Sequence, residues 1–122
     1  MLAALLFAVA TTAAIPPDVD VCMRAAAAVT HSTVDNTDQS GCVCTVGQLR
    51  KTLSPGDYAL HQTMEAIIAS GADEKSFNAQ LSAIMLKRGM DQTSADAFLA
   101  RSRAAEARAN GVCNPSPLLN GQ

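Results

Sequence analysis

The amino-acid sequence predicts an all-α fold, a small bundle of about four helices braced by two disulfides, with a cysteine-bearing loop after the first helix. Three observations lead to this prediction. Apolar residues recur at helical spacing in several segments, no segment shows the strict alternation of a β-strand, and the 122 residues include four cysteines. A chain of this length is expected to form one domain.

The composition leaves little material for a large apolar core. Hydrophobic residues make up 48% of the chain, but many of them are alanines, and there are only three Phe, one Tyr and no Trp. Such a thin core barely offsets the conformational entropy lost on folding, so covalent cross-links are expected to help. The net charge of −2, with acids and bases interspersed, argues against a nucleic-acid partner and against electrostatic attachment to a membrane.

The N-terminal segment MLAALLFAVATTAA has no charged side chain. An apolar run from Leu2 to Ala10 is followed by small residues, a pattern typical of a secretory signal peptide, although no Lys or Arg precedes the run. Pro16-Pro17 ends it before the roughly 18 apolar residues that a membrane-spanning helix needs. A buried first helix is the alternative interpretation. The predicted organisation is a signal peptide at 1–14, a single helical domain at 15–113 and a flexible tail at 114–122.

The first helix is expected to begin near Asp18, after two prolines, and to end near Thr30. Its apolar face would hold Val19, Cys22, Met23, Ala26 and Val29. Residues 32–41, STVDNTDQSG, are mostly polar and end in glycine, so they predict a loop in which Gly41 lets the backbone turn. This loop is predicted to carry the Cys-x-Cys pair, and a short helix follows at 48–53.

Three later helices have stronger start and stop signals. The segment Ser54-Pro55-Gly56-Asp57 combines a capping residue, a proline suited to the first turn and an acidic residue that complements the helix dipole. Gly71 and Gly89 are well placed to end the first two of these helices. The helices are expected to span Pro55 to Ser70, Ala72 or Asp73 to Arg88, and Asp91 or Thr93 to Asn110. Their apolar stripes hold Leu60, Met64, Ile67 and Ile68, then Phe77, Leu81, Ile84 and Met85, then Ala95, Phe98, Leu99 and Ser102.

The four cysteines are Cys22, Cys42, Cys44 and Cys113. An even number in an exported chain predicts disulfides. A bond between Cys42 and Cys44 would close a very small, strained ring, so each is expected to bond elsewhere. Cys22 would take one of them and Cys113 the other. In the chain-entropy model, bridges over about 20 and about 70 residues contribute roughly 3 and 4 kcal/mol, which rivals the net stability of a small domain.

The Cys-x-Cys pair also allows a thiol–disulfide redox site or a metal site. Arg50 and Lys51 lie close enough in sequence to activate a thiolate, but the usual Cys-x-x-Cys spacing and a βαβ pattern are missing. A four-cysteine zinc site would show two closely spaced pairs, and the sequence has one. Copper binding by the two thiols lacks an accompanying methionine or histidine cluster.

His31 and His61 are the only histidines. His31 is expected to end the first helix, where a cation suits the helix dipole. His61, next to Leu60, is expected at the edge of a core face. Neither is predicted to have a partner at ligand or catalytic spacing. The sequence contains no nucleophile-elbow, zinc-protease or phosphate-loop motif, so no catalytic residue, cofactor or bound metal is predicted.

These observations favour a small exported protein, periplasmic or extracellular, that acts as a non-catalytic binding or interaction module. Its partner would be another protein or a small apolar ligand, because alanine-rich helices leave shallow apolar surfaces. The alternative is a redox protein or metal binder that uses the Cys-x-Cys pair. Neither stable membrane insertion nor nucleic-acid binding is expected. The sequence leaves open the oligomeric state and which cysteine of the pair bonds to Cys22.

Overall fold

The computed structural model describes residues 14–34 and 36–114. Within these ranges the backbone forms no strand and five helices: α1 (Pro17–Thr30), α2 (Asn36–Thr52), α3 (Pro55–Ala69), α4 (Glu74–Lys87) and α5 (Gln92–Cys113). The all-α class with two disulfides is therefore confirmed. The predicted signal peptide and the predicted tail lie outside the described residues, apart from Ala14 and Asn114.

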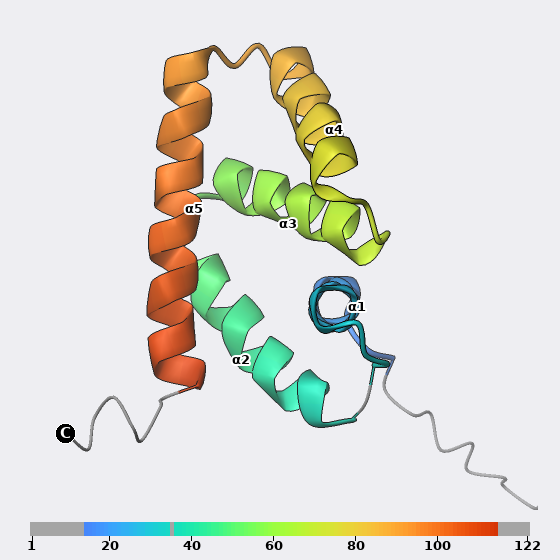
Figure 1. The fold of residues 1–122 in the computed structure, drawn as a ribbon. Coiled ribbons are helices and arrows are strands. Elements are labelled where there is room, and N and C mark those ends of the chain that lie inside the picture. Colours follow the sequence, from blue (N-terminus) through green and yellow to red (C-terminus); the bar gives the residue numbers. More distant parts are fainter. Residues whose placement is uncertain (1–13, 35, 115–122) are drawn as a thin grey trace, which may run out of the picture.

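The longest helix, α5, runs along one side of the molecule, and the other helices are arranged beside it (Figure 1). Helix α4 lies beside its first half, α3 crosses near its middle, and α2 lies along its second half. Helix α1 packs against α2 and α3, on the side away from α5. The chain therefore packs as two groups of helices, one around α4 and the other around α1 and α2, and α3 and α5 belong to both.

Helix α2 corrects the predicted cysteine-bearing loop. The loop at 32–41 is wrong in its second half, because α2 is continuous and absorbs the short helix predicted at 48–53. Its glycines and β-branched residues are weak helix formers. However, the buried residues Cys42, Val46 and Leu49 recur at i, i+4 and i+7 and pack against α1 and α5. Tertiary packing and the disulfides thus stabilise a helix that local propensity does not predict.

The starts of the last three helices agree with the prediction, which named Ser54 as a cap and gave Asp73 and Asp91 among the alternative first residues of the next two helices. The Ser54 hydroxyl accepts a hydrogen bond from the Asp57 N–H, and Pro55 occupies the first turn of α3. Asp73 and Asp91 cap α4 and α5 in the same way, each accepting a backbone N–H three residues further on. These contacts lie within a single turn, so the sequence alone specifies where the helices begin.

The glycines differ in whether the fold requires them. Gly71 and Gly89 have φ values of 79° and 72°, in the left-handed region, and they follow α3 and α4 as predicted. Gly41 and Gly47 instead lie inside α2, where a Cβ built on either would meet nothing within 4 Å. The turn predicted at Gly41 is therefore wrong, and neither packing nor backbone conformation requires a glycine at these two positions.

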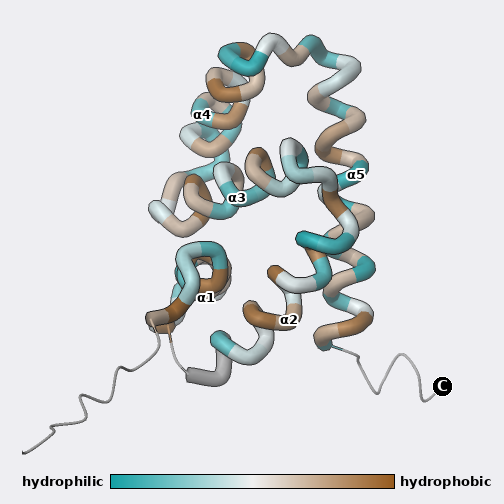
Figure 2. Tube along the Cα trace, turned by 180° about the vertical axis from the view of Figure 1, so that it is seen from behind, coloured by the Kyte–Doolittle hydropathy of each residue, from teal (hydrophilic) through white to brown (hydrophobic). Residues whose placement is uncertain are grey.

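The core is divided into three small clusters, as the scarcity of large apolar residues suggests. The first joins α3, α4 and α5 through Leu60, Met64, Leu81, Met85 and Phe98. The second joins α1 and α2 through Val19, Met23, Cys42 and Val46. The third joins α2 and α5 through Leu49, Leu53, Ala105 and Ala109. Hydrophobic and hydrophilic stretches alternate along each helix (Figure 2), and none of the helices described is long and apolar enough to cross a membrane.

Candidate functional site

The two disulfides connect α2 to both of its neighbours. Cys22 on α1 bonds to Cys42, 20 residues away, and Cys44 bonds to Cys113 at the end of α5, 69 residues away. Residues two apart on a helix are separated by about 200° around its axis. Cys42 and Cys44 therefore face opposite sides of α2, one towards α1 and the other towards α5. The helical conformation therefore explains how two cysteines with one residue between them can bond to α1 and to the end of α5.

All four sulfurs are thus in structural cross-links. Cys42 is buried among apolar residues of α1 and α2, while the other three cysteines are half-buried. A redox site or a thiolate metal site at the Cys-x-Cys pair needs both sulfurs free and facing one another. In this fold they are bonded to different helices, so the arrangement favours scaffolding.

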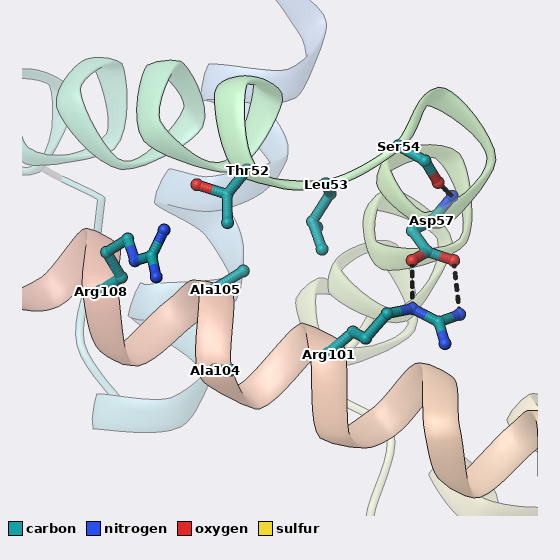
Figure 3. A pocket seen from close by; sticks show the side chains of 8 residues that line it. All are labelled: Thr52, Leu53, Ser54, Asp57, Arg101, Ala104, Ala105 and Arg108. Carbon is teal, nitrogen blue, oxygen red and sulfur yellow. Dashed lines mark hydrogen bonds and ion pairs between the residues drawn. The ribbon is translucent and has the colours of Figure 1, made fainter.

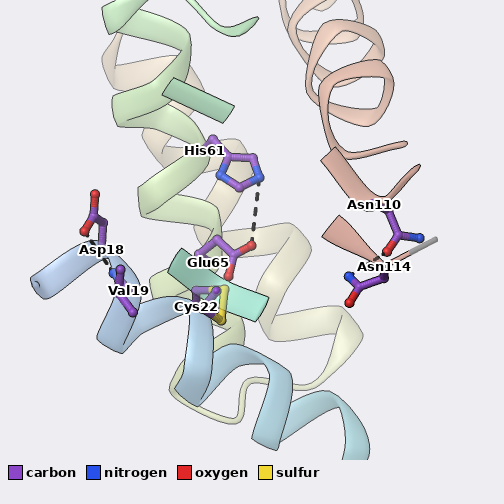
Figure 4. Close-up of a disulfide and its surroundings, with 8 residues drawn as sticks. Asp18, Val19, Cys22, His61, Glu65, Asn110 and Asn114 are labelled. Carbon is purple, nitrogen blue, oxygen red and sulfur yellow. Dashed lines mark hydrogen bonds and ion pairs between the residues drawn. A yellow bond between two sulfur atoms is a disulfide. The ribbon is translucent and has the colours of Figure 1, made fainter. Parts of the chain in front are cut away.

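A second cluster of polar side chains lies in the interior, around His61. This residue occupies the middle of α3 and is 1% exposed. Its Nε2 atom lies 2.8 Å from Oε1 of Glu106 on α5 and 3.9 Å from Oε1 of Glu65, one turn further along α3. The three ligand-capable atoms all lie within 4.8 Å of one another. Figure 4 shows the ring pointing towards Glu65, with Cys22 of α1 close by.

This cluster corrects the prediction that neither histidine has a partner. Glu65 follows His61 at i+4, a spacing that places both side chains on one face of a helix. This spacing is therefore a signal in the sequence for the contact between the two side chains. Glu106 is 45 residues away from His61 and reaches it only because α5 lies against α3. His31 takes a left-handed conformation just after α1, with a φ of 53°.

A pocket of about 440 Å³ adjoins the cluster. Small and apolar side chains of α1 form one wall, including Ala25, Ala26 and Val29. Glu65 of α3 and Glu106 of α5 line the pocket from the other helices, and no lysine or arginine is among its described lining residues. The space exists because the alanine run of α1 brings a helix close without filling the gap with long side chains. The pocket is therefore apolar on one side and acidic on the other.

The environment of Glu65 disfavours its ionised form. Burial is the largest cause of its raised pKa, and the neighbouring Glu106 carboxylate raises it further, while His61 acts in the opposite direction. The side chains of Glu65 and Glu106 are 22% and 47% exposed, so the pair lies at the boundary between the interior and the pocket. Two carboxylates and an imidazole in this position can share a proton or bind a cation.

Another pocket, of about 520 Å³, lies between the end of α2 and α5 (Figure 3). Arg101 crosses its mouth and donates two hydrogen bonds to Asp57, from Nε to Oδ2 at 2.7 Å and from Nη2 to Oδ1 at 3.1 Å. These bonds from Arg101 lower the pKa of Asp57, although partial burial opposes them. The charges of Asp57 and Arg101 satisfy each other, so they fasten α3 to α5, and Arg108 is the remaining charged side chain in the described lining.

Asp18 fastens the start of α1 in a similar way. The Tyr58 hydroxyl of α3 donates to Asp18 Oδ2 at 2.7 Å, and Arg50 of α2 pairs with the same oxygen. Burial alone would raise the pKa of Asp18, but the Tyr58 hydroxyl, the Val19 N–H and the Arg50 charge outweigh it, and the pKa is lowered. Three helices therefore meet at this carboxylate, which positions α1 over the His61 pocket.

No protein-family model, curated protein or solved structure matches this chain. The sites are accordingly distinguished by their chemistry. The Asp57 and Asp18 contacts are ion pairs and hydrogen bonds complete within the protein. The His61 cluster differs, because it places two carboxylates beside an open pocket with no basic side chain in the lining. It is the candidate functional site.

Proposed function

We propose that this small disulfide-bonded helical protein is an exported, non-catalytic binding module, periplasmic or extracellular. Its ligand would be a small cation held in the pocket between α1, α3 and α5. The observation that carries the binding proposal is the convergence of His61, Glu65 and Glu106 from two helices, where the two carboxylates line that pocket and the imidazole is buried beside them. A concave, mostly apolar site with a few convergent polar groups is the usual form of a ligand-binding site.

The lining favours binding over catalysis. Among the described lining residues the one hydroxyl, that of Thr30, donates to the Ala26 carbonyl of its own helix at 2.9 Å. The one sulfur among them, that of Cys22, is in a disulfide. No activated nucleophile therefore faces the carboxylates from this lining. The sequence led us to expect another protein or a small apolar ligand, and the two carboxylates in the lining favour a cation instead.

Export is supported by the cysteines and by the N-terminal segment. Structural disulfides persist in oxidising compartments and are rare where thiols are kept reduced. The segment at 1–14 has the apolar run and small residues of a signal peptide. Both features support the same location, a compartment outside the cytosol.

Expression of the full chain in a secretory host, followed by fractionation and intact-mass analysis without reductant, tests export. We expect a mature species that has lost about the first 14 residues and contains two disulfides. A full-length protein recovered with free thiols from the cytosolic fraction would contradict the proposal. The binding part is tested separately below, with protein whose disulfides are already known to be formed.

A further inference from the structure

We infer that His61, Glu65 and Glu106 bind a divalent transition-metal ion of the zinc class. This inference rests on the proposed binding function and names the chemistry of its ligand. Two of the three groups come from one face of α3 and the third from α5, so the site would join two helices that meet near the middle of the fold.

The distances suit a shared ion. Two ligand atoms bound at about 2.05 Å to a tetrahedral zinc ion lie about 3.3 Å from each other. The His61 Nε2 atom lies 2.8 Å from one carboxylate oxygen and 3.9 Å from the other. Each separation differs from the ideal by only about half an ångström. Side-chain rotations of Glu65 and Glu106 can supply such shifts, while the buried ring of His61 stays fixed.

The charges suit a cation as well. Glu65 and Glu106 approach the same imidazole from two helices, and the described lining of the adjoining pocket holds no lysine or arginine that could neutralise them. A divalent ion between the two carboxylates would balance their charge. The adjoining pocket of about 440 Å³ leaves room for a water or an additional ligand in the fourth position.

The donor set selects the kind of ion. Imidazole nitrogen is a good ligand for zinc, copper, iron and nickel, whereas calcium and magnesium prefer oxygen donors alone. One imidazole with two carboxylates therefore favours zinc-class ions over calcium or magnesium. The other ring nitrogen, His61 Nδ1, is buried and has no hydrogen-bond partner among the described residues. Because metal-binding histidines usually donate this N–H to an acceptor, the affinity is expected to be lower than that of a structural zinc site.

Titration calorimetry of the mature, oxidised protein with zinc chloride tests the inference, without reductant or chelating buffer. We expect one ion per chain. Glu106→Gln and Glu65→Gln should each weaken binding at least tenfold, since loss of even a second-shell partner typically costs about 10- to 100-fold. Glu74→Gln, the same substitution at an exposed position in the first turn of α4, is the matched control and should leave binding unchanged.

Glu106→Gln is the decisive variant, because this exposed side chain can be changed without disturbing the core, and circular dichroism would verify its fold. Zinc binding that is equally tight in both site variants and in the control would overturn the inference. Calcium or magnesium binding as tight as zinc would also overturn it, because imidazole ligation would then not matter.

A titration with tetramethylammonium, compared with the zinc titration, separates this inference from the proposed function. If tetramethylammonium binds and zinc does not, the metal assignment fails while the cation-binding proposal stands. If neither binds to correctly oxidised protein, both the metal site and the cation-binding proposal fail. Cobalt(II) provides a spectroscopic check, since its visible absorption should appear with the wild-type protein and be lost in Glu106→Gln.

Discussion

Removal of the Cys44–Cys113 disulfide should cost the protein much of its stability. The perturbation is the double substitution Cys44→Ala with Cys113→Ala. The bridge closes a loop of 69 residues, for which the chain-entropy relation gives about 14.7 cal/mol/K, or about 4.4 kcal/mol at 25 °C. Both sulfurs are half-buried, so truncation should add little through lost packing. We therefore expect the free energy of unfolding to fall by about 4 kcal/mol.

The assay is urea denaturation of the oxidised wild-type protein and the variant, followed by the helical circular dichroism signal. The slope of the free energy against urea should also rise, because an unfolded chain without the bridge exposes more surface. A loss below about 1 kcal/mol with an unchanged slope would refute the reasoning. It would mean that the unfolded chain without the bridge still keeps these segments close together, so that the bond removes little conformational entropy.

The Cys22–Cys42 bridge provides the comparison. Its loop of 20 residues gives about 3.3 kcal/mol by the same relation. Cys42 is buried with apolar residues of α1 and α2, so its truncation should add roughly the value of one buried methylene, about 0.8 kcal/mol. The two double variants should therefore be similarly destabilised, for different reasons. A variant lacking all four cysteines should not fold, since a domain of this size has a net stability of only about 5–15 kcal/mol.

Three other predictions concern α2, the α4 cluster and the α3–α5 ion pair. Gly41→Ala and Gly47→Ala should each raise the stability by up to about 1 kcal/mol, because the added methyl group meets nothing; a lower melting temperature would contradict this. Phe98→Ala should cost about 3–5 kcal/mol in urea denaturation, because Phe98 is 0% exposed at the centre of the cluster that holds α4; a loss under 1 kcal/mol would contradict it. Asp57→Asn should cost about 1 kcal/mol at pH 7. Since the Arg101 bonds lower the folded pKa of Asp57 below 3.8, this difference should persist above that pH and disappear as the pH falls through the folded pKa; a difference that grows in acid would contradict it.

The sequence predicted the second half of the fold better than the first. The starts of α3, α4 and α5 depend on Ser54, Asp73 and Asp91, whose capping bonds reach only three residues along the chain. Such local contacts can be read from a sequence. Helix α2 depends on residues that other helices cover, and its own composition favours a loop. The apolar spacing of Cys42, Val46 and Leu49 carried the missing signal, because a disulfide-bonded cysteine packs as an apolar residue.

The sequence could predict only part of the candidate site, because one of its residues is brought in by another helix. The relation between His61 and Glu65 follows from helical spacing, whereas Glu106 enters the site through the packing of α5 on α3. The cysteines were easier to interpret, since ring strain alone separates Cys42 from Cys44. Which of these two cysteines bonds to Cys22 depends on the side of α2 that each side chain faces, and this is known only once the segment is known to be helical.

The order of pairing along the chain has a consequence for biosynthesis. The first cysteine bonds to the second and the third to the fourth, so the two loops follow one another without interlacing. If the chain is exported as we propose and is translocated with its N-terminus leading, Cys22, Cys42 and Cys44 arrive before Cys113. An oxidase that joins cysteines as they arrive makes the Cys22–Cys42 bond first and leaves Cys44 waiting for the last helix. Pairing in the order of arrival would therefore give both native bonds without rearrangement.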